Sequence, residues 1–260
     1  MCRYCLDAAA QHQVRRSDGR DAQAMVHPIE RRNVLKLGLA AAAAAAASLT
    51  VAPRARAKAV PKPENAISPD AALARLMKGN HRYVEGVGRR YDFKSEREAL
   101  SRGQNPFAAI LSCADSRIAP EFCFDTARGD VFVCRVAGNL ATAEIVASLE
   151  YAVQVLNTPL VMVLGHDACG AVDAAIKSIK DATTLPGHLP SLVDAIKPAV
   201  DAAKGESGDM LANTIRKNVA LNVEKLKGVA PILKSFVDDK KIRIVGGVYE
   251  LRTGKVELVG

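Results

Sequence analysis

Residues 107–117, FAAILSCADSR, join an apolar run directly to a group of chemically reactive side chains. A second segment with the same plan, LVMVLGHDAC, occupies residues 160–169. Both apolar runs are typical of strands that are buried on both faces of a parallel sheet. If the two strands are parallel neighbours, their carboxyl ends bring two thiols, an imidazole and a carboxylate to one edge of that sheet. Such a set favours a small, borderline-soft dication, and Zn²⁺ fits it best.

The expected metal ligands are Cys113, His166 and Cys169, because H-x-x-C on one turn places an imidazole and a thiolate within reach of a single ion. Asp115 has two alternative roles. It is close enough to Cys113 in the chain to bind the metal itself and close the site. Alternatively, Arg117 holds its carboxylate in a bidentate pair, which leaves the fourth metal position free for water. The residues alone leave both arrangements open.

Disulfide bonds are the main alternative use of cysteines in an exported protein. A chain of 260 residues can bury a core without covalent cross-links. Cys113 and Cys169 also stand beside Asp, Arg and His residues, the usual company of a metal ligand. Cys123 and Cys134 lack such neighbours and are predicted to be free, partly buried thiols. The lone C-x-x-C at residues 2–5 receives no metal role.

The net charge of +8 looks at first like a sign of an acidic partner, but most of the excess lies in residues 1–57. The rest of the chain is nearly balanced and has no basic run with interleaved aromatics, which argues against nucleic-acid binding. The chain has 49% apolar residues and no Trp, so we expect a core of Val, Leu, Ile and Ala. Its length predicts one domain with an appendage.

The appendage, residues 1–57, is predicted to be a twin-arginine signal peptide with an extended n-region. Paired arginines at 31–32 precede an alanine-rich tract, and Ala-Arg-Ala at 55–57 forms a small-x-small cleavage site. A membrane anchor is the alternative, but the tract is short and alanine is weakly hydrophobic. Met25 is an alternative start of the chain.

Residues 58–67 are expected to be a linker, and the mature protein is expected to be periplasmic or secreted, with no stable membrane association after cleavage. The twin-arginine route moves folded proteins. A zinc–thiolate site would therefore be loaded in the reducing cytoplasm before the protein meets an oxidising compartment.

The domain is expected to span residues 68–260 and to be an α/β fold, with a mainly parallel β-sheet, an antiparallel edge strand and flanking helices. Ligands in such folds bind beyond the carboxyl ends of the strands. No P-loop, G-x-G-x-x-G motif or internal repeat is present. The expected strands are 107–112, 131–136, 159–164 and 242–249, with an edge strand at 255–259, and helices begin near Ser68, Thr142 and Cys169.

Three motifs, in this order, resemble the β-class carbonic anhydrases: CADSR at 113–117, RVAGN at 135–139 and GHDACG at 165–170. The segments GNHRY at 79–83 and GQNP at 103–106 resemble the same family. The resemblance implies reversible hydration of CO₂ to bicarbonate and a proton by a zinc-bound hydroxide. It also implies one Zn²⁺ per subunit and a homodimer or homotetramer.

The resemblance also implies a role for each matching residue. Cys113, His166 and Cys169 become the zinc ligands, while Asp115 and Arg117 become the catalytic dyad, with Asp115 accepting a hydrogen bond from the hydroxide. Gln104 would bind substrate, Tyr151 would line the substrate pocket at a subunit interface, and Gly138 would lie in the loop that borders the site.

One position departs from the family pattern. Ile110 stands where members with a non-catalytic bicarbonate site have Trp, although Arg135 matches the arginine of that site. The resemblance therefore leaves bicarbonate regulation open.

Two other functions compete with CO₂ hydration. A hydrolase of another small heterocumulene, such as CS₂ or COS, would use the same attack by zinc-bound hydroxide. A non-catalytic, zinc-stabilised module would use Asp115 as a permanent fourth ligand. Because two thiolates donate more negative charge than imidazoles, an enzyme with this ligand set is expected to be more active at alkaline pH.

Overall fold

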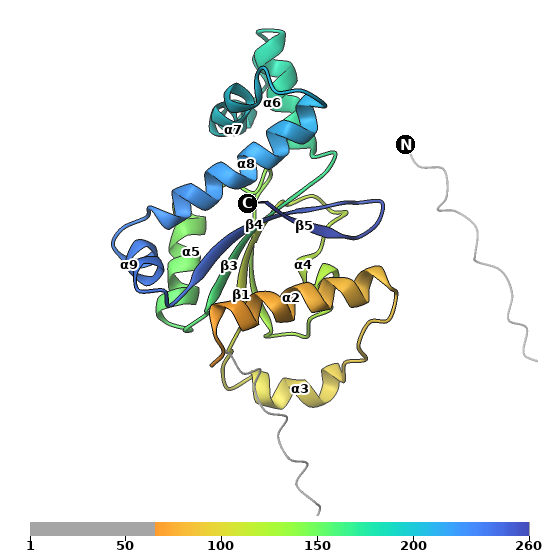
Figure 1. Cartoon of the computed structure of the whole chain (residues 1–260), viewed down its shortest axis with the longest axis vertical. Coiled ribbons are helices and arrows are strands. Elements are labelled where there is room, and N and C mark those ends of the chain that lie inside the picture. Colours follow the sequence, from red (N-terminus) through yellow and green to blue (C-terminus); the bar gives the residue numbers. More distant parts are fainter. Residues whose placement is uncertain (1–65, 260) are drawn as a thin grey trace, which may run out of the picture. The chain divides into compact units, whose positions relative to one another are not determined.

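A computed structural model describes residues 66–259 of the chain (Figure 1). The predicted signal peptide and nearly all of the predicted linker lie outside the described residues. The elements in chain order are α2 (Pro69–Val84), α3 (Phe93–Leu100), β1 (Ala108–Ser112), α4 (Pro120–Cys123), β2 (Val131–Arg135), α5 (Ala143–Gln154), β3 (Leu160–His166), α6 (Gly170–Lys180), α7 (Leu189–Ala203), α8 (Met210–Lys227), α9 (Ile232–Asp238), β4 (Arg243–Tyr249) and β5 (Val256–Val259).

The five strands form one sheet in the order β2-β1-β3-β4-β5. The first three pairings are parallel, and β5 runs antiparallel to β4 at the edge. The expected fold class is therefore confirmed. β1 and β3 are direct neighbours, and Ser112 at the end of β1 lies opposite Leu164. Their carboxyl ends thus open at the same place, as the two apolar runs predicted.

The sheet is covered on both faces, and alternate residues of β1 serve different cores. Ala108 and Ile110 pack with the apolar residues of α2 and α4. Ala109 and Leu111 point to the opposite face and pack with α5, α8 and α9. Figure 1 shows α8 and α9 on one side of the strands and α2 and α4 on the other. Every residue of β1 and β3 is buried, which explains why both strands are continuous apolar runs.

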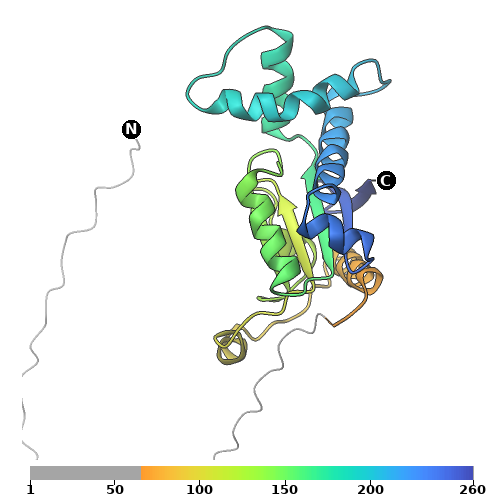
Figure 2. The same cartoon turned by 90° about the vertical axis from the view of Figure 1, so that its left-hand side faces the viewer.

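A third apolar cluster lies beyond the carboxyl ends of the strands. In both views α6 and α7 stand together past the sheet, and α8 runs from them back along it (Figures 1 and 2). Val172 of α6, Ile196 of α7 and Ile215 of α8 pack in this cluster with Cys113 and Cys169. The three helices therefore surround the predicted metal site with apolar side chains.

Two details differ from the expectations. β3 continues through Gly165, so His166 is the last residue of a strand instead of part of the following turn. The short helix α9 was not among the expected elements; it begins directly after Pro231 and ends at Asp238. The predicted start of the first helix is confirmed, because the Ser68 side chain accepts a hydrogen bond from the Ala71 amide at 3.2 Å.

Among residues 66–259, no helix has the length and apolarity to cross a bilayer.

Candidate metal centre

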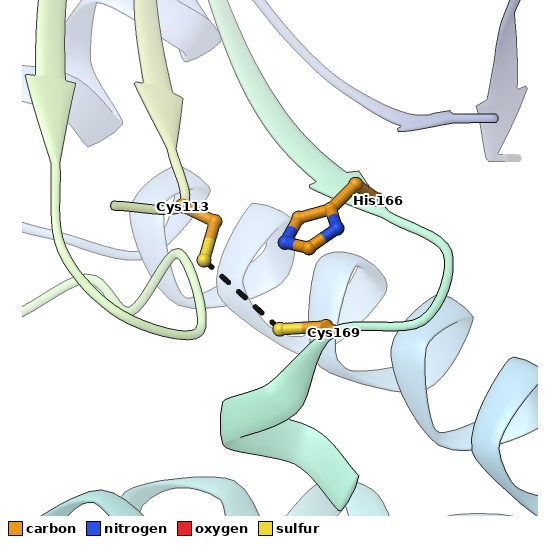
Figure 3. Close-up of side chains that lie close together, drawn as sticks. All are labelled: Cys113, His166 and Cys169. Atoms are coloured by element: carbon orange, nitrogen blue, oxygen red, sulfur yellow. Dashed lines mark hydrogen bonds between the residues drawn. The ribbon is translucent and has the colours of Figure 1, made fainter. Parts of the chain in front are cut away.

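Cys113, His166 and Cys169 come together from three elements (Figure 3). Cys113 follows β1, His166 ends β3 and Cys169 is the N-cap of α6. The two Sγ atoms are 4.0 Å apart, and the donor atoms of all three residues lie within 4.8 Å of one another. All three side chains are buried. The structure thus brings together the three ligands that the sequence predicted.

The orientation of His166 tests whether this group suits a metal ion. Its Nδ1 lies 2.8 Å from the carbonyl oxygen of Asp167, which can only accept, so Nδ1 carries the proton. That leaves Nε2 with a free lone pair, and within residues 66–259 this buried atom has no hydrogen-bond partner. A buried polar atom without a partner calls for an explanation, and an ion held by one imidazole and two thiolates supplies it. The residues present therefore fit Zn²⁺.

The surroundings of the two thiols favour a thiolate. The Gly138 amide donates to Cys113 Sγ over 3.4 Å. The hydrogen bond from Cys169 lowers the pKa of Cys113, while the same contact, together with burial, raises the pKa of Cys169. The contact between the two sulfurs thus favours a thiolate at Cys113. Cys169 also begins α6, where the helix dipole favours negative charge.

Asp115 is paired with Arg117. Arg117 Nε and Nη2 donate to the two carboxylate oxygens at 2.9 and 2.7 Å, and the Arg117 backbone amide adds a third bond at 2.9 Å. These bonds hold the pKa of Asp115 well below its usual range. Arg117 Nη2 also donates to the Ala168 carbonyl at 3.1 Å, which ties the pair to the turn between His166 and Cys169.

The carboxylate lies beside the metal ligands. Asp115 Oδ2 is 3.8 Å from Nε2 of His166, too far for a hydrogen bond but near enough to face whatever occupies the centre of the group. The structure therefore has the second of the two arrangements considered for Asp115, the pair with Arg117. Binding of Asp115 to the metal stays a prediction.

Arg135 holds the loop that carries Cys113 and Asp115. Its guanidinium donates to three backbone carbonyls, those of Cys113 at 2.9 Å, Asp115 at 2.6 Å and Ile118 at 2.9 Å. Ile110, at the position where the resemblance led us to look for a tryptophan, is buried in the sheet. In this structure, Arg135 thus fixes the backbone of the loop that carries Cys113 and Asp115.

The three predicted substrate-binding residues lie in different surroundings. Gly138 borders the site, since its amide contacts Cys113 Sγ, and its φ of +75° suits glycine. Gln104 is exposed in the single chain. Tyr151 is 46% exposed, with its ring 6.3 Å from that of Phe132 on the edge strand β2. Their predicted roles stay predictions.

Two further contributions to the site were not anticipated. The Asp167 carboxylate accepts the Leu251 amide at 2.9 Å, which fastens the turn after β3 to the hairpin between β4 and β5. Asn218 and Asn222 of α8 bind the loop at residues 138–141. Two polar residues spaced one turn apart on the buried face of a helix were a signal that the sequence contained.

Comparison with known proteins agrees with this geometry. The family model described as "Carbonic anhydrase" matches residues 108–256. Carbonic anhydrase 2 of Mycobacterium tuberculosis is 36% identical over 192 residues, which cover 74% of this chain and 93% of that protein. The chain belongs to the carbonic anhydrase family.

Solved structures place it in the β class. The β-carbonic anhydrase CcaA is 27% identical, with a TM-score of 0.55 over 72% of this chain and 94% of that one. Tetrameric β-carbonic anhydrases from Sordaria macrospora share the fold, with a TM-score of 0.57, 20% identity and coverage of 74% and 96%. The predicted family and enzyme class, a carbonic anhydrase, are confirmed.

Proposed function

We propose that this carbonic anhydrase hydrates CO₂ reversibly to bicarbonate and a proton, with Zn²⁺ held by Cys113, His166 and Cys169. The observation that carries the proposal is the buried, unpartnered Nε2 of His166 beside two thiols, with an ionised carboxylate 3.8 Å away. Bound there, Zn²⁺ would supply a Lewis acid strong enough to make water a nucleophile near neutral pH.

Asp115 and Arg117 would orient the reacting water. Because Arg117 keeps Asp115 ionised, the carboxylate accepts a hydrogen bond and does not donate one at neutral pH. An acceptor beside the ligand atoms turns an O–H toward itself and leaves the oxygen lone pair free for CO₂. The apolar walls from α6, α7 and α8 suit a small apolar substrate.

The proposed assembly is a homodimer or homotetramer, in which Gln104 and Tyr151 reach the site of a partner subunit or their own site near the interface. Three features support it: β2 is an open edge of the sheet, Phe132 and Tyr151 form an aromatic pair beside that edge, and the Sordaria enzymes are tetrameric. Native mass spectrometry of the purified chain measures the subunit number.

Export by the twin-arginine route to the periplasm belongs to the same proposal, and rests on the paired arginines and Ala-Arg-Ala at 55–57. Sequencing the N-terminus of the mature protein tests it. A terminus at Lys58 in the periplasmic fraction supports the proposal, and an intact leader in the cytoplasm contradicts it.

Stopped-flow CO₂ hydration, with and without a chelator, tests the activity. We expect zinc-dependent turnover that rises toward alkaline pH, because two thiolates weaken the acidity of a zinc-bound water. Asp115 does not cause this rise, since its pKa lies below its usual range and its carboxylate is already ionised throughout. Stoichiometric zinc without CO₂ turnover would indicate a structural zinc module, and turnover of CS₂ or COS alone would indicate a heterocumulene hydrolase.

Asp115→Asn keeps the size of the side chain but removes its charge. We expect its turnover to fall on the order of 100-fold with zinc retained, because an amide can present its N–H₂ group to the water in place of an acceptor. Glu98→Gln on α3, which loses only an exposed ion pair with Arg102, is the matched control and should leave turnover unchanged.

A further inference from the structure

Helix α8 carries two asparagines on its buried face. Asn218 is 2% exposed and Asn222, one turn later, is 7% exposed. The neighbouring positions Ile215, Val219 and Val223 on the same face are apolar core residues. Burying an amide without partners costs free energy, so these two side chains must have specific partners.

The partners lie in the loop beside the metal ligands. Asn218 Nδ2 donates to the Gly138 carbonyl at 2.8 Å, and the Ala141 amide donates to Asn222 Oδ1 at 2.8 Å. Asn222 Nδ2 also donates to the backbone oxygen and to Oδ1 of Asn218, at 2.8 and 3.2 Å. This last contact fixes the amide of Asn218 with its oxygen toward Asn222 and its nitrogen toward Gly138.

Gly138 is therefore held at both of its polar groups. Its carbonyl is bound by Asn218, and its amide donates to Cys113 Sγ over 3.4 Å. A side chain at this position would be strained, because its φ is +75° and a Cβ would lie 3.1 Å from Ile196 Cδ1. The hydrogen bond to the sulfur thus depends on where Asn218 holds the loop.

The helix is a rigid support for Asn218. Val219, the next residue, packs so close to the sheet that a Cβ on Gly165 would come within 2.6 Å of Val219 Cγ2, and one on Gly246 within 2.7 Å of Val219 Cγ1. The two glycines lie on the adjacent strands β3 and β4. Asn218 cannot follow a displaced loop without moving α8 off the strands.

From these contacts we infer that Asn218 is a positioning residue for the metal centre. It fixes Gly138 so that the backbone N–H donates to the Cys113 thiolate, and the bond withdraws charge from that sulfur. Asn218 thereby sets how strongly Cys113 donates to the metal and how firmly the metal is retained. The inference rests on the proposed zinc function, and goes beyond it by assigning a role to a helix that holds no ligand.

The experiment compares Asn218→Ala with Thr214→Val in the full chain. Thr214 is one turn earlier on the same buried face, and its hydroxyl donates only within α8, to the Met210 carbonyl at 2.7 Å. The cobalt-substituted proteins are compared by the energy of the sulfur-to-cobalt charge-transfer band, and the zinc proteins by the rate of zinc loss to a chelator. Asn218→Asp, which keeps the shape and the Oδ1 acceptor but loses the donor to Gly138, is the second variant if the alanine variant does not fold.

We expect the Asn218 variants to shift the charge-transfer band to longer wavelength, because a sulfur without its N–H donor holds its electrons less tightly. Zinc loss should be roughly 10- to 100-fold faster, because a loop that Asn218 no longer fixes holds the Cys113 side chain less firmly in place. Thr214→Val should match the wild type in both measurements. Identical band energies and zinc half-lives in the Asn218 variants, Thr214→Val and the wild type would overturn the inference alone. Failure of the wild type to bind cobalt or zinc would overturn the proposed function as well.

Discussion

The described part of the chain contains four buried, free cysteines that fall into two pairs with opposite surroundings. Cys113 and Cys169 lie beyond the strand ends, 4.0 Å apart, among backbone amides and beside His166. Cys123 and Cys134 lie in the apolar cores on the two faces of the sheet. Burial is nearly the same for all four, so burial does not decide which cysteine binds a metal.

The difference lies in what stabilises negative charge. Burial raises the pKa of Cys123 to about 11 and also raises that of Cys134. At Cys113 the hydrogen bond from Cys169 outweighs burial and lowers the pKa. A thiolate is the form that ligates a metal, so the first pair offers one ready thiolate, that of Cys113, and the second pair offers none.

The largest effect is expected when one cysteine of each pair is replaced by serine. Cys113→Ser should lose the bound zinc and reduce CO₂ hydration on the order of 1,000-fold or more, because several kcal/mol of Lewis-acid stabilisation are lost. Cys134→Ser, the control, should keep stoichiometric zinc and near-normal turnover. Metal analysis and stopped-flow assays measure both. Full zinc content in Cys113→Ser would contradict the conclusion that the two pairs differ in metal binding.

A smaller effect is expected from Asp167, which is not one of the proposed zinc ligands but holds the turn that carries two of them. Asp167→Ala removes the acceptor of the Leu251 amide and loosens the turn that carries His166 and Cys169. Zinc affinity, measured by competition with a chelator, should fall roughly 10- to 100-fold. Asp167→Asn should fall less, because its amide oxygen still accepts that bond. Asp173→Ala, which loses only a surface pair with Lys177 on α6, should bind zinc normally.

The smallest effect concerns the reactivity of Cys123. In the folded, metal-free protein at pH 8, iodoacetamide should label Cys113 first and leave Cys123 unmodified, because the pKa of Cys113 is lowered while a pKa of about 11 leaves few thiolates at Cys123. Peptide mass spectrometry identifies the labelled residue.

The same raised pKa gives a pH dependence of stability. The folded state holds the Cys123 proton more tightly than the unfolded state. The protonated thiol therefore contributes fully to the free energy of unfolding below the ordinary thiol pKa of about 8.5. This contribution is lost as the pH rises toward about 11. In the iodoacetamide experiment, early labelling of Cys123 at pH 8 would show that the apolar core does not control the titration of this thiol.

Much of the site followed from the sequence, because its ligands sit at the ends of strands whose apolar runs are continuous. The runs before Cys113 and His166 predicted buried parallel strands, and neighbouring parallel strands end at the same edge. The pairing of Asp115 with Arg117 was one of two arrangements that their spacing allowed, and the structure has it.

The residues that support the site could not be predicted from the sequence. Arg135, Asp167 and Asn218 act on backbone carbonyls and amides, which every residue carries, so no sequence pattern shows which ones they reach. Asn218 contacts a loop 80 positions away in the chain, across a helix packing that only the folded structure defines. Gln104 and Tyr151 are exposed in the single chain, so neither the sequence nor one subunit shows what they contact in the proposed assembly.

The parallel pairing of β1 with β3 has a consequence for the order of events during synthesis and folding of the chain. Cys113 and Cys169 are brought together only when the chain between them has crossed over and both strands have joined the sheet. Such long-range parallel pairing forms slowly compared with local structure. A nascent chain on the ribosome therefore offers no complete binding place for the ion, even after both cysteines have been synthesised. If the site holds Zn²⁺ as proposed, the metal content of a cell extract would therefore report the chains that have finished folding, and not all the chains that have been synthesised.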